Sequence, residues 1–294
     1  MLLLPLLAAT QSPYTPEIEA LLRRRDDKRR QETQAQVLRK EEAAAFSGLL
    51  PPEIAQRLTA CLAKADVGSQ AGLDEAAKWA GEGGGAHAAH CKGYALGKAQ
   101  RFAEAAAAFE AGGRMAGTDA VTRARLWSQA GNAALVAGDV PRALADFDQA
   151  LEQPLPATLS TGEIHLDRAR ARVAAEDVKG ARDDLDKALQ MAPADPLGWL
   201  LSATLARRTD DLAMARAHIE QAAKLSRNDP NIALEQGVIY ALSGDRDPAA
   251  RAAFQRAEQT AGGDEALVRK ARAYLAQLPP EPAPATPAGP PDVK

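Results

Sequence analysis

Two sets of positions in the middle of the chain repeat with one shared period. The small residues of the first set lie 38, 38, 34 and 34 residues apart and comprise Gly93, Gly131, Ala169, Ala203 and Gly237. The large apolar residues of the second set lie 38, 38, 34 and 35 residues apart and comprise Phe109, Phe147, Leu185, Ile219 and Phe254. Chance alanine-richness would not keep small and large residues in register. The chain is therefore expected to be an array of repeated units.

The composition indicates what each unit is made of. Hydrophobic residues make up 46% of the chain, but aromatic residues only 4%. Alanine dominates, and alanine, leucine, arginine and glutamate all favour helices because they lose little side-chain entropy there. Long β-branched runs, which are typical of strands, are missing. The predicted fold class is therefore all-α.

The repeat resembles the tetratricopeptide repeat family over about residues 53–278. The residues that carry the resemblance are Trp127, Gly131, the Gly138-Asp139 turn, Ala143, Phe147 and Ala150, and in a later copy Trp199, Ala203, Ala215, Ile219 and Ala222. The resemblance implies an α-solenoid: antiparallel helix pairs cross closely at the small residues and stack into a right-handed superhelix. About six pairs are expected, the first of them degenerate, with a capping helix over Glu265–Leu278.

Four segments follow from this reading. Residues 51–278 are the repeat array with its C-terminal cap. Residues 1–12 are apolar, end in small residues and predict a signal peptide, although no Lys or Arg precedes the apolar run. Residues 13–50 predict a charged helix, and residues 279–294, with seven prolines, predict a disordered tail.

The N-terminal segments leave the location open. A cleaved signal peptide would place the protein in the periplasm or outside the cell. If residues 1–12 are instead an apolar helix end, a cytoplasmic location follows. The charged segment 13–50 could contact phospholipid headgroups, but its basic and acidic residues nearly balance, which favours a solvated helix. No other stretch approaches the ~20 apolar residues of a membrane span.

The chain has two cysteines, Cys61 and Cys91. They fall at nearly equivalent positions in the first helices of neighbouring repeats, which pack side by side in this family. A disulfide is expected if the protein is exported, and two buried thiols otherwise. His87, His90 and Cys91 have spacings suited to metal ligands, but a tetrahedral site would need a further ligand, and no metal site is predicted.

No catalytic site is expected. Ser128, Ser202 and Ser243 have no matched histidine in the sequence, and the acidic pairs Asp183-Asp184 and Asp210-Asp211 are interpreted as solvated. No cofactor motif is present. The formal net charge of −3, from 36 basic and 39 acidic residues, gives no general attraction to nucleic acid.

The expected working surface is the concave face, which first helices line in this family. Mapping the repeat register onto it predicts peptide-binding residues Tyr94, Arg125, Gln129, Asn132, Asp167, Arg170, Leu197, Leu200, Leu201, Leu234 and Val238. The family's clamp for C-terminal carboxylates is not expected, because only Asn132 and scattered arginines match it and Asp167 would repel a carboxylate. Several of the leucines could instead pack against neighbouring helices.

The sequence thus predicts a non-enzymatic scaffold that binds a protein or peptide, in the bacterial periplasm. An extended or helical peptide with a hydrophobic anchor would suit the polar centre and apolar C-terminal end of the face. The alternative is an envelope assembly factor or structural spacer that associates with the membrane through its N-terminal segment.

Overall fold

The computed structural model describes residues 50–154, 161–244 and 247–279. The chain divides into residues 1–52 and residues 53–294, and the helical array belongs to the second unit. The predicted signal peptide, nearly all of the predicted charged helix and the proline-rich tail beyond residue 279 lie outside the described residues.

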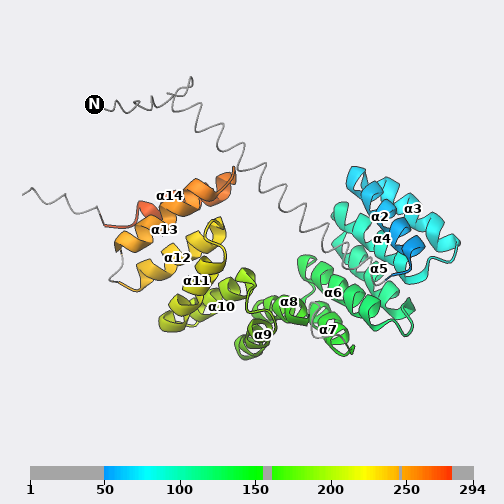
Figure 1. The fold of residues 1–294 in the computed structure, drawn as a ribbon, viewed down its shortest axis with the longest axis horizontal. Helices are drawn as coiled ribbons and strands as arrows, with labels where there is room; N and C mark the ends of the chain where they lie inside the picture. The colour runs from blue at the N-terminus through cyan, green and yellow to red at the C-terminus, as the bar shows by residue number, and fades with distance from the viewer. Residues whose placement is uncertain (1–49, 155–160, 245–246, 280–294) are drawn as a thin grey trace, which may run out of the picture. The chain divides into compact units, whose positions relative to one another are not determined.

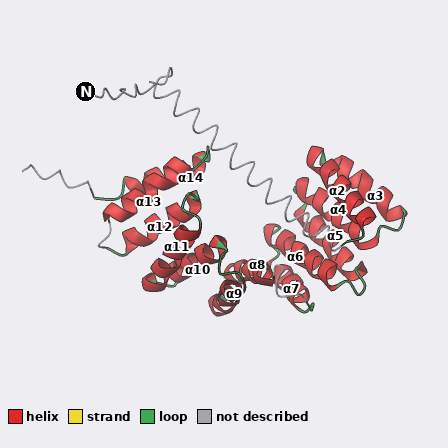
Figure 2. Ribbon diagram, viewed as in Figure 1, coloured by secondary structure: helices red, strands yellow, loops and turns green. Residues whose placement is uncertain are grey.

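Within the described ranges, the secondary structure consists of thirteen helices and no strands (Figure 2). The first helices of the successive pairs are α2 (Pro52–Val67), α4 (Gly85–Lys98), α6 (Ala120–Val136), α8 (Thr161–Ala174), α10 (Pro196–Arg208) and α12 (Pro230–Leu242). The second helices are α3 (Ser69–Gly81), α5 (Phe102–Met115), α7 (Val140–Leu151), α9 (Val178–Met191), α11 (Leu212–Leu225) and α13 (Asp247–Thr260). A last helix, α14 (Glu265–Leu275), follows. The predicted all-α class is confirmed.

From α3 onward, helices that follow one another in the chain pack side by side (Figure 1). Each first helix from α4 to α12 contacts its own second helix and the second helix of the preceding pair. Helix α14 packs against both α12 and α13, in the position expected of a cap. One pair cannot bury its apolar stripe alone, so this stacking supplies the core.

Aspartates fix where many of the helices begin. The side chains of Asp119, Asp139, Asp177, Asp195, Asp211, Asp229 and Asp264 each accept a backbone N–H of the helix that follows. Helices α10 and α12 also place a proline next to the capping residue, where its missing N–H costs nothing. Asp211 is thus a helix cap, which gives the Asp210-Asp211 pair a local structural role.

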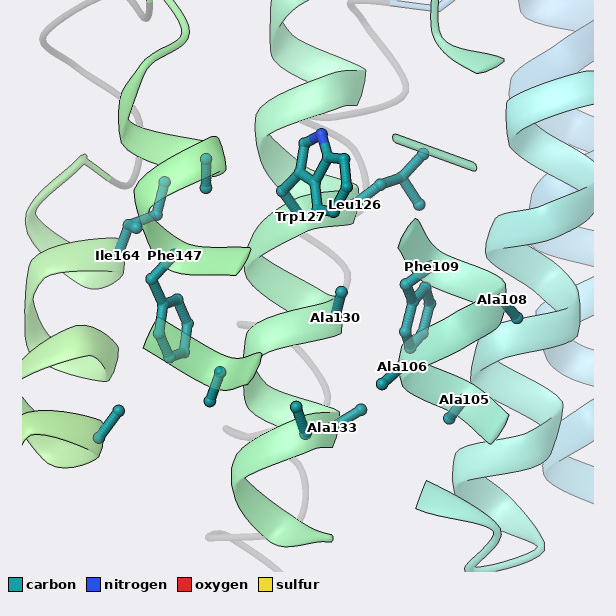
Figure 3. Packing of buried hydrophobic residues seen from close by; sticks show 14 of the residues in the cluster. Ala105, Ala106, Ala108, Phe109, Leu126, Trp127, Ala130, Ala133, Phe147 and Ile164 are labelled. Carbon is teal, nitrogen blue, oxygen red and sulfur yellow. The ribbon is translucent and has the colours of Figure 1, made fainter. Parts of the chain in front are cut away.

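The shared period of small and large residues has a direct packing cause. A Cβ added at Gly93 would lie 2.6 Å from the Phe109 ring, and one added at Gly131 would lie 2.8 Å from the Phe147 ring. Both phenylalanines are buried, and Figure 3 shows them among the side chains that fill the spaces between neighbouring helices. The aromatic rings therefore need glycine on the facing helix.

Candidate functional site

All eleven predicted binding residues lie on the first helices α4, α6, α8, α10 and α12. The first of them, Tyr94, is tied to the preceding pair. Its hydroxyl donates to Asp66 Oδ1 at 2.7 Å, and the Lys98 ammonium lies 6.0 Å from its ring. Lys98 also pairs with Asp66 at 3.0 Å. Tyr94 therefore connects α4 to the end of α2.

The structure brings three predicted polar residues together between α6 and α8. Asn132 Nδ2 donates to Asp167 Oδ2 at 2.6 Å, and the Arg170 guanidinium donates to Asp167 Oδ1 at 3.1 Å. The neighbouring Gln129 is half-buried, and its Oε1 is a buried atom with no hydrogen-bond partner in the described part of the chain. Asn132, Asp167 and Arg170 thus form a hydrogen-bonded polar cluster between α6 and α8.

Arg125, also on α6, acts on a buried histidine of α4. Burial, then the charge of Arg125 and then that of His87, lower the pKa of His90 to about 3. His90 is therefore neutral at physiological pH, and its ring meets Phe109 edge-on with centroids 6.0 Å apart. His90 belongs to the packing within the α4–α5 pair.

The apolar residues of the face divide into two groups. Leu200, Leu201 and Leu234 are half-buried, and each packs against a core cluster of its own part of the array. Val238 is half-buried as well, whereas Leu197 is 49% exposed. The alternative that some of these leucines pack against neighbouring helices is thus correct for three of them.

One cavity opens among the predicted residues, between α8 and α10. Its volume is 190 Å³, and its lining consists of Ala169, Arg170, Val173, Leu185, Leu201, Thr204, Leu205 and Arg208. Leu185 of α9 contributes to the apolar lining, and the arginine side chains are exposed. The cavity can accept an apolar side chain, with a cation on each first helix beside it.

A larger cavity of 760 Å³ lies elsewhere, between α3, α4 and α5. Alanine is the most frequent residue in its walls, and none of the predicted residues line it. Arg101 and Glu104 at its edge pair with each other. It offers a broad apolar groove without a net charge to select a ligand.

Comparisons with known proteins agree with this architecture. Residues 128–198 match the family model described as Tetratricopeptide repeat. No curated protein sequence is detectably similar to the chain. Among solved structures, pilF from Pseudomonas aeruginosa is similar with a TM-score of 0.56 at 12% identity, covering 76% of this chain and 99% of that one.

Two further structures are similar to the array. The C-terminal part of a TPR repeat-containing protein from Cytophaga hutchinsonii gives a TM-score of 0.52 at 14% identity, over 86% of this chain and 98% of that one. TTC0263 from Thermus thermophilus, a thermophilic TPR protein, gives 0.52 at 19% identity, over 65% and 99%. The chain has a tetratricopeptide repeat fold.

Two interpretations of polar residues in the tetratricopeptide array were wrong. Asp184, expected to be solvated, is fully buried on α9. Its carboxylate accepts from Arg168 at 2.7 and 2.9 Å, contacts His165 Nδ1 at 2.7 Å and pairs with Arg172 at 3.0 Å. Burial alone would raise the pKa of Asp184, but the hydrogen bonds of His165 and Arg168 and the nearby guanidinium charges outweigh it and lower the pKa to about 2.

The second correction concerns Ser202, which does have a histidine partner. Its hydroxyl lies 2.8 Å from His218 Nδ1 on α11 and accepts from the Arg182 guanidinium at 2.6 Å. Burial, followed by the charge of Arg182, lowers the pKa of His218. Ser202 has no exposed surface, so a substrate cannot reach it. The pair links neighbouring helices of the tetratricopeptide array and gives no support to hydrolytic chemistry.

The predicted cysteine pairing is present in the structure. A disulfide joins Cys61 of α2 to Cys91 of α4, with the two Cα atoms 6.1 Å apart and both residues fully buried. His87 stacks near Trp79 with ring centroids 6.3 Å apart. Among the described residues, no group of three or more His, Cys, Asp or Glu side chains is arranged to hold a metal ion, and no helix has the length and apolar character to cross a membrane.

Proposed function

We propose that this protein is a non-enzymatic scaffold that binds a peptide or an extended protein segment along its first helices. Tetratricopeptide repeat proteins bind peptides and proteins. The observation that carries the proposal is the apolar opening between α8 and α10, which lies among exposed arginines on the predicted face. An apolar opening beside charged groups is the usual form of a side-chain recognition site.

The two buried polar groups that most resemble catalytic arrangements have structural partners. Asp184 is enclosed by His165, Arg168 and Arg172, and the Ser202–His218 pair is buried. A reaction needs a nucleophile or proton donor that a substrate can reach. Binding is therefore the function that this face supports best.

We further propose that the protein works in an oxidising compartment, the periplasm in a bacterium. Structural disulfides persist where the surroundings are oxidising and are rare in the cytosol. The buried Cys61–Cys91 bond and the apolar residues 1–12 both support this location.

Crosslinking in the native cell tests the binding face. A photoreactive amino acid is placed at Leu197 or Arg125 on first helices and, as a matched control, at the exposed Ala213 on the second helix α11. A specific partner should be captured from the first two positions and not from the third. Capture from Ala213 alone, or turnover of a substrate by the purified protein without a partner, would contradict the proposal.

The location has a separate test. Intact mass after thiol alkylation in the lysed cell reports both N-terminal cleavage and the state of the two cysteines. A shortened chain without alkylated cysteines is expected. A full-length chain carrying two alkyl groups would place the protein in the cytoplasm while leaving the binding face unaffected.

A further inference from the structure

Polar side chains join successive first helices at two interfaces, one on each side of the α8–α10 interface. Between α6 and α8, Asn132 donates to Asp167 at 2.6 Å. Between α10 and α12, Arg207 pairs with Glu235 at 2.6 Å. Asp167 and Glu235 occupy the same place in the repeat, two residues before the small residues Ala169 and Gly237.

The interface between α8 and α10 has no such bridge at that place. The equivalent residue, two before Ala203, is Leu201. The residue that corresponds to Arg207 is Val173 on α8, four after Ala169, so the pair equivalent to Arg207–Glu235 is apolar here. The residue that corresponds to Asn132 is Arg170, whose partner on α10 would be Leu201. Leu201 and Val173 instead line the 190 Å³ cavity. The opening therefore lies where the repeat lacks its polar bridge.

The charges beside this opening are positive and can be reached. Arg208 is exposed and forms no ion pair with any residue that the structure describes. Arg170 is also exposed and donates to Asp167, but Asp167 keeps the hydrogen bond from Asn132 if Arg170 turns away. Arg207 is engaged by Glu235 in the next interface. Arg208 is thus available to a carboxylate, and Arg170 becomes available when a ligand carboxylate replaces its exposed contact with Asp167.

We propose that the α8–α10 opening binds an aliphatic side chain of an acidic peptide, with Arg170 and Arg208 contacting carboxylates on either side of it. This inference rests on the proposed binding function and adds the chemistry of the ligand. The apolar lining favours a side chain of about the size of leucine. The arginine forks favour flanking carboxylates and disfavour a basic peptide.

The test is a fluorescence anisotropy titration of the full oxidised chain. The probe is a labelled peptide with a central Glu-Leu-Glu sequence between Gly-Ser spacers. Two matched peptides replace either the leucine with serine or both glutamates with glutamine. The first should bind about tenfold more tightly than either matched peptide, because each of them removes one of the two contacts.

Two variants locate the site, and one serves as a control. Arg208→Glu changes an exposed residue and should weaken the Glu-Leu-Glu peptide by roughly three- to tenfold. Leu201→Glu restores the acidic residue of the neighbouring bridges and should abolish the preference for leucine over serine. Arg269→Glu on α14 makes the same charge change at an exposed position away from the opening and should leave affinity unchanged.

Equal affinity for all three peptides, or no binding at roughly millimolar concentration, overturns the proposal. So does tight binding that Arg208→Glu and Leu201→Glu leave intact. In either case the scaffold function still stands if crosslinking from Leu197 captures its partner. If crosslinking and peptide binding both fail, the proposed function falls as well.

Discussion

The α6–α7 pair and the α8–α9 pair bury an aspartate at the same place in the repeat and treat it in opposite ways. Asp146 directly precedes the anchor Phe147, and Asp184 directly precedes the anchor Leu185. Their exposed fractions are 4% and 0%. The repeat register therefore turns this position inward in both pairs, although its residue is an acid.

The side chains of the facing first helix determine the partners and the pKa of the buried aspartate. Asp184 meets His165, Arg168 and Arg172, whereas two of the equivalent positions facing Asp146 are occupied by Trp127 and Ala130. Asp146 Oδ2 is buried without a hydrogen bond in the described chain. Burial, followed by the charge of Glu110, raises the pKa of Asp146 to about 7 against the opposing charges of Arg142 and Arg114.

Asp184 is thus the centre of an ion-pair network in the α8–α9 pair, whereas Asp146 is an acid without a hydrogen bond at Oδ2 in the α6–α7 pair. Burial removes the hydration of a carboxylate, and a carboxylate without partners in the folded protein gains little to offset that cost. This difference makes measurable predictions for stability.

The largest effect is expected from Asp184→Ala. The change leaves Arg168 and Arg172 without their buried partner and should lower the free energy of unfolding by about 3–5 kcal/mol. Urea unfolding followed by circular dichroism measures it. Asp183→Ala is the matched control, because Asp183 is exposed and only pairs with Lys179 on the same helix. Equal losses for both variants would show that the buried network does not distinguish the two pairs.

Asp146→Ala should change the free energy of unfolding in the opposite direction. Alanine is already the residue at the equivalent positions Ala108 and Ala253. Removing the unsatisfied carboxylate should raise the free energy of unfolding by about 1–3 kcal/mol at about pH 8. The folded-state pKa of about 7 lies above the ordinary 3.8, so the folded chain holds the proton longer. The gain should therefore shrink as pH falls from about 7 to 4, where wild type and variant converge.

The fall in the free energy of unfolding at acid pH should come from Asp184. Its folded-state pKa of about 2 lies below the ordinary 3.8, so the unfolded chain binds the proton first as pH falls. The stabilisation that it provides is complete above about pH 4 and should decline by roughly 2 kcal/mol on the way to pH 2. Comparing acid unfolding of wild type with Asp184→Asn isolates this contribution. If the variant loses stability at acid pH just as the wild type does, other carboxylates cause the loss.

The smallest effect is expected at the exposed end of the same network. Arg168 also pairs with Asp148 of α7 at 2.6 Å, and the Asp148 side chain is 56% exposed. Asp148→Ala should cost less than about 1 kcal/mol, and high salt should mask the loss. A loss as large as that of Asp184→Ala would mean that the pairing between α7 and α8 matters more than burial.

Much of the fold was readable from the sequence because packing imposes it. The Gly131–Phe147 pairing explains why small and large residues share a period, and that period gave the all-α class and the helix pairs. The same register placed Asn132, Asp167 and Arg170 on one face, where the structure brings them together. Repetition makes these features local and regular.

The burial and partners of the polar residues were harder to predict, because they depend on how the helices cross and not on residue type. Aspartate is usually solvated, and only the three-dimensional crossing of α8 and α9 turns Asp184 inward. A signal existed, since Asp146 and Asp184 both precede a large anchor. Ser202 and His218 are 16 residues apart on different helices, so their contact depends on the helix crossing and the side-chain rotamers. The partners of a buried polar group follow from that geometry.

The disulfide gives the array a preferred direction of unfolding. A chain of stacked pairs opens most easily at its ends, because a terminal pair has one neighbour instead of two. The Cys61–Cys91 bond closes a loop with a sequence separation of 30 near the N-terminal end of the described array, and such a bond removes about 3–4 kcal/mol of unfolded-state entropy. Helices α13 and α14 have no comparable tie, so amide exchange should begin there in the oxidised protein. A reductant would remove this asymmetry and allow both ends to open.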